Sequence, residues 1–154
     1  MLTDRCVRDV RRGDLGDILA IDAAAFATPL NENELLDLLR QRRVGGYAHE
    51  CYGRVLGYAI YEHGRAGAHL LRLAVDPKFR RQGVGTALVQ KILSLPDGRR
   101  ADITATVRES SLEAALFLRA CGFTARLKRG GFSDTHEDAY VFTSRIQEEV
   151  CVGR

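Results

Sequence analysis

The segment RRQGVGTALV, residues 80–89, places two arginines, a glutamine and two glycines directly before an amphipathic stretch. It follows the apolar run LLRLAV and the turn DP. A strand, a glycine-containing loop and a helix start bring free backbone N–H groups and the positive end of a helix dipole to one point, which favours an anion. Gly83 and Gly85 allow close approach of the backbone, and Arg80 or Arg81 adds positive charge. The segment therefore predicts a phosphate site.

The spacing of these glycines excludes one common nucleotide site and argues against another. The chain has no GxxxxGK[ST] motif, which excludes a P-loop NTPase. It has no GxGxxG followed about 20 residues later by an acid, which argues against a dinucleotide-binding Rossmann site. Glycine-rich turns between a strand and a helix also occur for packing alone. The loop by itself leaves a ligand role and a packing role open.

Length and composition indicate one soluble globular domain. The chain has 154 residues, of which 45% are hydrophobic and 28% charged, enough to bury a core. No window approaches the roughly 18 consecutive apolar residues of a membrane-spanning helix, and the charged start MLTDRCVRDV is unlike a signal peptide. We expect a cytoplasmic protein without a membrane partner, in which residues 1–147 form the domain and residues 148–154 a short tail.

Charge and cysteine usage restrict the partners. The net charge is +3 at pH 7, and no basic stripe is interleaved with aromatic residues, so a nucleic-acid partner is not expected. The four cysteines are scattered without a CxxC pair, which predicts reduced, mostly buried thiols and no metal site. The sequence leaves a monomer and a homodimer open.

Hydrophobic periodicity predicts one mixed α/β domain with elements in the order β α α β β β α β α β β. Three capping signals mark helix starts: Asp14, Asn31 with Glu34, and Ser110 with Glu113. The expected strands lie at 5–10, in two runs within 47–64 joined by a turn, at 67–75, at 101–107, at 123–132 and at 138–146, and the expected helices start near 15, 32, 84 and 111.

The stretch LAVDPKFRRQGVGTALV resembles the acetyl-CoA signature of the GNAT superfamily of N-acetyltransferases, whose core pattern is [RQ]xxGx[GA] after a strand ending in VxP. Here the pattern falls on Arg80, Gly83 and Gly85 after Val75 and Pro77. The predicted order of elements agrees with the fold of that superfamily over nearly the whole chain. The resemblance implies a mixed, mostly antiparallel central sheet of six to seven strands flanked by about four helices.

The resemblance also implies which residues hold acetyl-CoA. Backbone amides of residues 81–86 would bind the pyrophosphate. The backbone at the end of the preceding strand would line the pantetheine and polarise the thioester carbonyl, and preorganised N–H donors at a developing oxyanion are a large catalytic effect. The residues implied in coenzyme binding are Leu73, Ala74, Val75, Arg80, Arg81, Gln82, Gly83, Val84, Gly85, Thr86 and Ser111.

Three further stretches are similar to the branch that acetylates protein N-termini, typified by ribosomal-protein alanine N-acetyltransferases. They are AFATPLNENEL, VRESSLEAALFLRACGF and HEDAYVF. The first implies that Pro29 and Leu30 lie in a loop that flanks a peptide, with Leu30 where the branch usually has Trp. The third implies that Glu137 orients a substrate amine or a loop. The activity implied is acetyl transfer to a primary amine, most specifically a protein or peptide N-terminal α-amine.

The chain departs from this branch at its acid–base residues. Thr106 stands where the branch has a general-base Glu, Ser111 where it has Asn, and Leu118 where it has the Tyr that protonates the leaving thiolate. An α-amino group with a pKa of about 7.8 is roughly a tenth neutral at pH 7, so a site with a weak base suits N-termini better than lysines. His69 as base and Tyr140 as acid are hypothetical substitutes.

Each substitute has a packing alternative. Strand alternation predicts that His69 shares a face with Leu71, Leu73 and Val75, but a histidine near a strand start can serve structure alone. Tyr140 can simply pack its ring in the last strand.

Two other functions stay open. A small-molecule amine acetyltransferase would have a closed, acidic acceptor pocket, whereas a peptide acceptor needs one that is open at both ends. A coenzyme A-binding module with decayed catalysis is suggested by Thr106 and Leu118, and it predicts binding without turnover.

Overall fold

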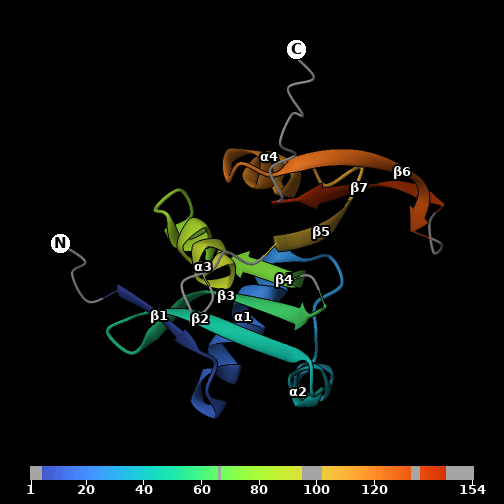
Figure 1. Ribbon diagram of the computed structural model, residues 1–154. Helices are drawn as coiled ribbons and strands as arrows, with labels where there is room; N and C mark the ends of the chain where they lie inside the picture. The colour runs from blue at the N-terminus through green and yellow to red at the C-terminus, as the bar shows by residue number, and fades with distance from the viewer. Residues whose placement is uncertain (1–4, 66, 95–101, 133–135, 145–154) are drawn as a thin grey trace. The chain divides into compact units, whose positions relative to one another are not determined.

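The computed structural model describes residues 5–65, 67–94, 102–132 and 136–144 (Figure 1). The chain divides into two compact units, Met1–Ala101 and Asp102–Arg154. Among the described residues, seven strands and four α-helices follow one another in the order β1 α1 α2 β2 β3 β4 α3 β5 α4 β6 β7. The mixed α/β class and the order expected from the sequence are therefore confirmed.

The first unit contains four antiparallel strands that run side by side in the order β1-β2-β3-β4 (Figure 1). Tyr52 and Gly53 join β2 to β3, and both have a positive φ, of 49° and 77°. A two-residue turn with positive φ matches the right-handed twist of a hairpin, and this explains the glycine. The strands are β1 (Arg5–Asp9), β2 (Val44–Cys51), β3 (Arg54–His63) and β4 (Gly67–Val75).

Helices cover both faces of these strands. Helices α1 (Leu15–Ala25) and α2 (Glu32–Arg40) pack on the face that carries Tyr58 and Ile60, with Ile18, Ile21 and Leu35 in the buried core. Helix α3 (Val84–Leu93) packs on the other face, where it contacts β2, β3 and β4. Alternation along β3 separates the two layers, because successive side chains of a strand point to opposite faces.

Strand β4 carries a β-bulge at its middle residue. Arg72 is in register with Ile60 of β3, whereas the next pair is Leu70 with Tyr61, so Leu71 is the extra residue. A bulge reverses the alternation of side chains along the strand. Residues on the two sides of Leu71 therefore do not follow one parity.

The second unit contains three strands in the order β5-β7-β6 and one helix. Strand β7 pairs antiparallel with both neighbours, and Ile103, Ala105 and Phe142 are buried. The elements are β5 (Asp102–Arg108), α4 (Leu112–Ala120), β6 (Thr124–Phe132) and β7 (Glu137–Thr143).

The helix starts test the three capping predictions. The capping box of Asn31 and Glu34 is present, with an amide-to-side-chain distance of 2.8 Å in one direction and 3.2 Å in the other. Asp14 does precede α1, but its carboxylate does not cap the helix, because it accepts from Arg8 and from the Arg11 amide. The predicted box of Ser110 and Glu113 is wrong.

Helix α4 begins one residue later than the predicted box requires. Ser111 is the N-cap residue of α4 and makes no side-chain capping bond. The amide of Ser110 donates instead to Oε1 of Glu137 at 2.7 Å. The Glu137 carboxylate of the last strand therefore takes the amide that the predicted box assigned to Glu113.

The cysteines differ in part from expectation. Cys51 is buried and Cys121 is half-buried, but Cys6 is exposed on β1, where its thiol lies 3.9 Å from a carboxylate oxygen of Glu50. Cys151 lies outside the described residues. Within the part of the chain that the structure describes, no helix has the length and apolar character needed to cross a membrane.

Candidate active site

The loop between β4 and α3 has an unusual backbone. Asp76 caps the short 3-10 helix Pro77–Phe79 by accepting the Lys78 amide at 3.0 Å. Arg81 and Gly83 then adopt positive φ values of 62° and 79°. A non-glycine residue in the left-handed region costs of order 1–3 kcal/mol and is concentrated at functional sites. The strained conformation of residues 80–83 is therefore typical of a functional site and not of a simple connection between a strand and a helix.

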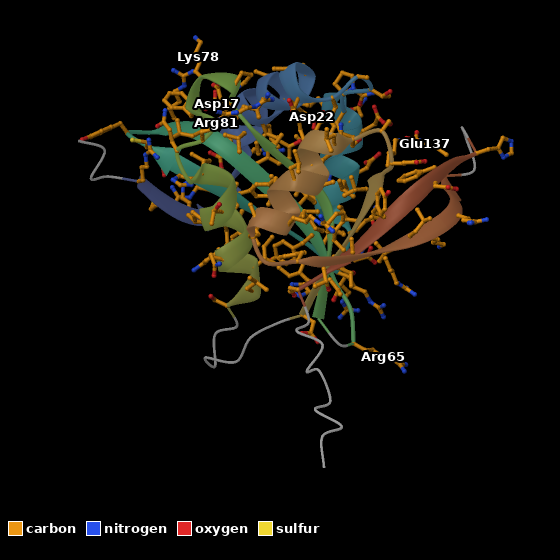
Figure 2. All side chains as sticks on the ribbon, turned by 90° about the horizontal axis from the view of Figure 1, so that it is seen from above. Asp17, Asp22, Arg65, Lys78, Arg81 and Glu137 are labelled. Atoms are coloured by element: carbon orange, nitrogen blue, oxygen red, sulfur yellow. The ribbon has the colours of Figure 1, made fainter. Side chains whose placement is uncertain are left out.

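The first turn of α3 begins at the end of this loop. The amide of Ala87 donates to the Gly83 carbonyl at 3.0 Å, so the amides of Val84, Gly85 and Thr86 precede the first helical hydrogen bond. They carry the positive end of the helix dipole. Arg80 and Arg81 are exposed beside this turn, and Figure 2 shows Lys78 pointing away from the ribbon. This loop, residues 80–86, fits an anionic ligand.

Two residues of the neighbouring strands support the loop. Arg5 of β1 donates to the Gln82 carbonyl at 3.1 Å and to its Oε1 at 2.6 Å. His49 of β2 is buried beneath the helix start, with Nδ1 3.4 Å from the Val84 carbonyl oxygen. Burial lowers the pKa of His49, the contact with Val84 raises it, and the charge of Arg5 lowers it further, with a net decrease. A neutral His49 therefore underlies the loop.

Strand β4 brings its carboxyl end next to the loop. Leu73, Ala74 and Val75 pair with Ala59, Tyr58 and Gly57 of β3. Nε of Arg80 lies 3.4 Å from the Val75 carbonyl oxygen, at the edge of hydrogen-bond distance. The strand residues and the loop residues that the sequence resemblance implied for acetyl-CoA therefore occupy one continuous region of the first unit.

The loop between α1 and α2, Phe26–Leu30, is held by a buried ionic cluster. The Asp22 carboxylate has no exposed surface and accepts from Nε of Arg72 at 2.6 Å and from the Leu30 amide at 2.7 Å. The Tyr58 hydroxyl donates to it as well. Pro29 is exposed and Leu30 is half-buried against the core. The predicted acceptor residues therefore lie in a loop fixed by side chains of β3 and β4.

Hydrogen bonding keeps Asp22 ionised. Burial by itself raises the pKa of Asp22, but the bonds from Arg72, Tyr58 and the Leu30 amide outweigh it and hold the pKa below its usual value. The pKa of Tyr58 is raised, first by burial and then by its bond to Asp22. The cluster is thus a carboxylate and a guanidinium with a neutral phenol.

Sequence reasoning missed this cluster and the support from Arg5 and His49. A signal was present in two places: Arg72 interrupts the apolar run LLRLAV, and Asp22 interrupts ILAIDAAAF. A charged residue in a buried strand or helix needs a partner, because an unpaired buried charge is costly. The sequence did not say which acid meets which base.

The position predicted for His69 is wrong. Because of the bulge at Leu71, His69 is in register with Glu62 of β3, whereas Leu73 is in register with Ala59. Glu62 and Ala59 are three residues apart, so their side chains point to opposite faces. His69 therefore lies on the face of Arg72 and the acceptor loop.

The remaining predicted residues lie in the second unit. Ser111 is half-buried at the start of α4, and Leu118 is buried. The carboxylate of Glu137 accepts the Ser110 amide and lies 3.7 Å from a guanidinium nitrogen of Arg108. Glu137 thus organises the turn before α4.

Tyr140 and Thr106 point to opposite faces of the strands β5, β7 and β6. Tyr140 pairs with Val107 and Thr106 pairs with Val141, so the two residues differ in parity. The Tyr140 ring contacts Phe142 with the ring centroids 6.5 Å apart. Tyr140 therefore does not occupy the face on which the branch carries its Glu.

A comparison with protein families decides the assignment. The profile of the Acetyltransferase (GNAT) family matches residues 15–123, which include α1, the β4 strand, the 80–86 loop and α4. The chain belongs to the GNAT family.

Relatives of this GNAT chain are known in several organisms. The [ribosomal protein bS18]-alanine N-acetyltransferase of Escherichia coli K12 is 31% identical and covers 86% of this chain and 92% of its own. The glucosamine 6-phosphate N-acetyltransferase of Trypanosoma brucei brucei is 29% identical, over 64% of this chain and 74% of its own. The crystal structure of Ard1 from Thermoplasma volcanium aligns with a TM-score of 0.77 and 26% identity, covering 92% of this chain and 97% of that one.

Membership of the GNAT family gives the geometry a chemical meaning. The protein is an acetyltransferase of GNAT type. The left-handed conformations at Arg81 and Gly83 and the free amides at the α3 start suit a pyrophosphate, so the residues present fit acetyl-CoA.

Proposed function

We propose that this protein transfers the acetyl group of acetyl-CoA to a primary amine, and that this amine is the N-terminal α-amine of a protein or peptide. The observation that carries the proposal is the conformation of the 80–86 loop at the end of β4, with the Pro29–Leu30 loop anchored to the same strand through Arg72. Residues 1–147 would act as one domain, with residues 148–154 as its tail.

The chemistry needs a neutral amine. Its nitrogen forms a bond to the thioester carbonyl carbon, the carbon–sulfur bond breaks, the thiolate leaves as coenzyme A, and the amine loses one proton. About a tenth of an α-amine with pKa near 7.8 is neutral at pH 7, against fewer than one in a thousand lysine side chains. With Thr106 in place of the branch's Glu, the reaction favours the weakly basic amine.

The backbone of Leu73, Ala74 and Val75 would polarise the thioester carbonyl, and Ser111 would give one hydrogen bond to the pantetheine. We propose His69 as the residue that accepts the amine proton, supported by its place on the face of Arg72. Tyr140 is the proposed donor to the leaving thiolate, because its phenol hydroxyl can give a proton and Leu118 stands where the branch has its Tyr. Glu137 would orient the substrate amine or order the turn before α4.

A small-molecule acceptor is the second candidate, because the trypanosomal relative is named for glucosamine 6-phosphate. A carboxylate-lined pocket would be needed for a small cation. In the described acceptor loop the one carboxylate that reaches it, Asp22, is fully buried and already bonded to Arg72. This arrangement favours a peptide over a small cation.

The test is thiol release from acetyl-CoA with a panel of acceptors. The panel pairs each peptide with its N-terminally blocked form and includes lysine-containing blocked peptides, polyamines and amino sugars. We expect release with free N-termini and none with the blocked partners, with a mass increase of one acetyl group on the N-terminal residue. Release only with amino sugars or polyamines would transfer the assignment to the second candidate.

A further inference from the structure

The Asp22 carboxylate is the meeting point of three segments of the first unit. It has no exposed surface, and it accepts from Arg72 through Nε at 2.6 Å and a terminal nitrogen at 2.9 Å, from Tyr58 and from the Leu30 amide. Replacing a buried ion pair by neutral groups is often tolerated, so such a pair is weak evidence for stability. The contacts of the pair therefore indicate a role other than stability.

Those contacts converge on one loop. The Arg72 guanidinium lies over the Phe26 ring at 3.9 Å from its centroid and donates to the Thr28 carbonyl at 3.1 Å. Asp22 takes the Leu30 amide at 2.7 Å. The first, third and fifth residues of Phe26–Leu30 are therefore bound by the pair, through a ring, a carbonyl and an amide. This loop has little freedom while the pair is intact.

Arg72 also has a particular place in β4. It directly follows the bulge residue Leu71 and directly precedes Leu73–Val75. Its guanidinium thus joins the strand segment assigned to the acetyl donor to the loop assigned to the acceptor. The side chain is 20% exposed, so most of it lies inside this junction (Figure 2 labels Asp22).

We propose that the Arg72–Asp22 pair is a positioning device that fixes the Phe26–Leu30 loop against β4 and thereby sets the affinity for the acceptor amine. The inference rests on the proposed function, because it assigns the loop to the acceptor. Arg72 and Asp22 are positioning residues, acting through Pro29 and Leu30.

The same unit offers a matched control. Arg8 and Asp14 also form a bidentate pair, at 2.8 and 2.9 Å, and their side chains are 15% and 8% exposed. This second pair also bonds to Asp9, Arg11 and Glu50, which lie outside the acceptor loop and β4. Neutralising it removes a comparable ion pair without touching the loop.

The experiment compares Arg72→Gln with Asp22→Asn in one chain against Arg8→Gln with Asp14→Asn in another. The first double variant leaves no charge buried and unpaired, a state that could prevent folding. In the control, Glu50 loses Arg8 as its partner, so Glu50→Gln is added to that chain. For each protein we would measure the acetyl-CoA Kd, the KM and kcat for a peptide acceptor, and the hydrogen exchange rate of the Leu30 amide by NMR.

In the Arg72–Asp22 variant we expect the acceptor KM to rise about tenfold with kcat within about threefold, the pattern of lost acceptor binding. Exchange at Leu30 should accelerate about tenfold or more, because local opening becomes easier. The acetyl-CoA Kd should stay within about twofold of wild type. The control pair should change none of the three beyond these limits.

Unchanged KM and Leu30 exchange in the Arg72–Asp22 variant would overturn the proposal, as would equal losses in the control. The proposed function and the positioning role of the pair are tested by different measurements. If the wild-type protein releases no thiol with any amine, the proposed function fails. Leu30 exchange still reports whether the pair fixes the loop, and unchanged exchange overturns the positioning role.

Discussion

Arg5 of β1 holds Gln82 by two hydrogen bonds, 3.1 Å to its carbonyl and 2.6 Å to its side-chain oxygen. The two residues are 77 positions apart in the chain, and Gln82 lies between the two left-handed residues Arg81 and Gly83. A residue of the first strand therefore supports the strained turn that precedes α3.

Replacing Arg5 by leucine should weaken acetyl-CoA binding. A hydrogen bond to a charged group contributes about 1.5–3 kcal/mol. If about half of that free energy is lost from acetyl-CoA binding, the Kd rises roughly three- to tenfold. Calorimetric titration measures it. Arg12→Leu removes the same charge from an exposed position and serves as control. An equal effect in both variants would attribute the change to net charge, contrary to this account.

Gly57→Ala should disturb the start of α3. A Cβ at Gly57 would lie 2.8 Å from Cγ1 of Val84 and 3.1 Å from the Ala74 carbonyl oxygen. Overpacking of this kind costs about 1–3 kcal/mol, so we expect a lower free energy of unfolding in urea and weaker acetyl-CoA binding. Gly13→Ala, with nothing within 4 Å of the new Cβ, should change neither. Wild-type behaviour of the Gly57 variant would show that α3 does not depend on this contact.

His49 should make stability depend on pH. Burial lowers its pKa in the folded state, so below the unfolded value of about 6.5 the unfolded chain binds more protons. Stability present above that pH is lost as the pH falls through the folded pKa. Unfolding free energies measured from pH 7.5 to 5 should decline in wild type and decline less in His49→Leu. Parallel curves for the two proteins would contradict the assignment.

The proposed acid and base can be tested separately. General acid–base catalysis contributes about 10²–10⁴-fold, so His69→Gln and Tyr140→Phe should each lower kcat by at least about 100-fold if they hold these roles. The acetyl-CoA Kd is the control for both. A kcat within twofold of wild type would remove the residue from the mechanism. Tyr140 lies on the face opposite Thr106, the position of the branch's general base, so the acid role of Tyr140 depends most on the result of Tyr140→Phe.

Local sequence signals predicted most of the fold. The helix start at Val84, the capping box at Asn31 and the Gly53 turn are decided by residues within a few positions of one another, and each is confirmed. The family signature likewise lies in one continuous segment, residues 73–89, and the family is confirmed.

Features that depend on distant residues could not be predicted. One extra residue at Leu71 reverses the strand parity, and that reversal moved His69 to the other face. The Ser110–Glu113 box failed because Glu137, 27 positions away, binds the Ser110 amide. The pairing of Asp22 with Arg72 spans 50 positions. In each case the deciding partner is brought close only by the tertiary fold.

The most direct test of the central claim is thermal unfolding with and without acetyl-CoA, followed by thiol release on adding a peptide with a free N-terminus. Ligand at about a hundred times its Kd should stabilise the protein by roughly 2.7 kcal/mol, a Tm increase of about 5 to 10 °C for a chain of this size. We predict that increase together with thiol release. An unchanged Tm would contradict the assignment of residues 80–86 to the coenzyme, and an increase without release from any amine would leave a binding protein in place of a transferase.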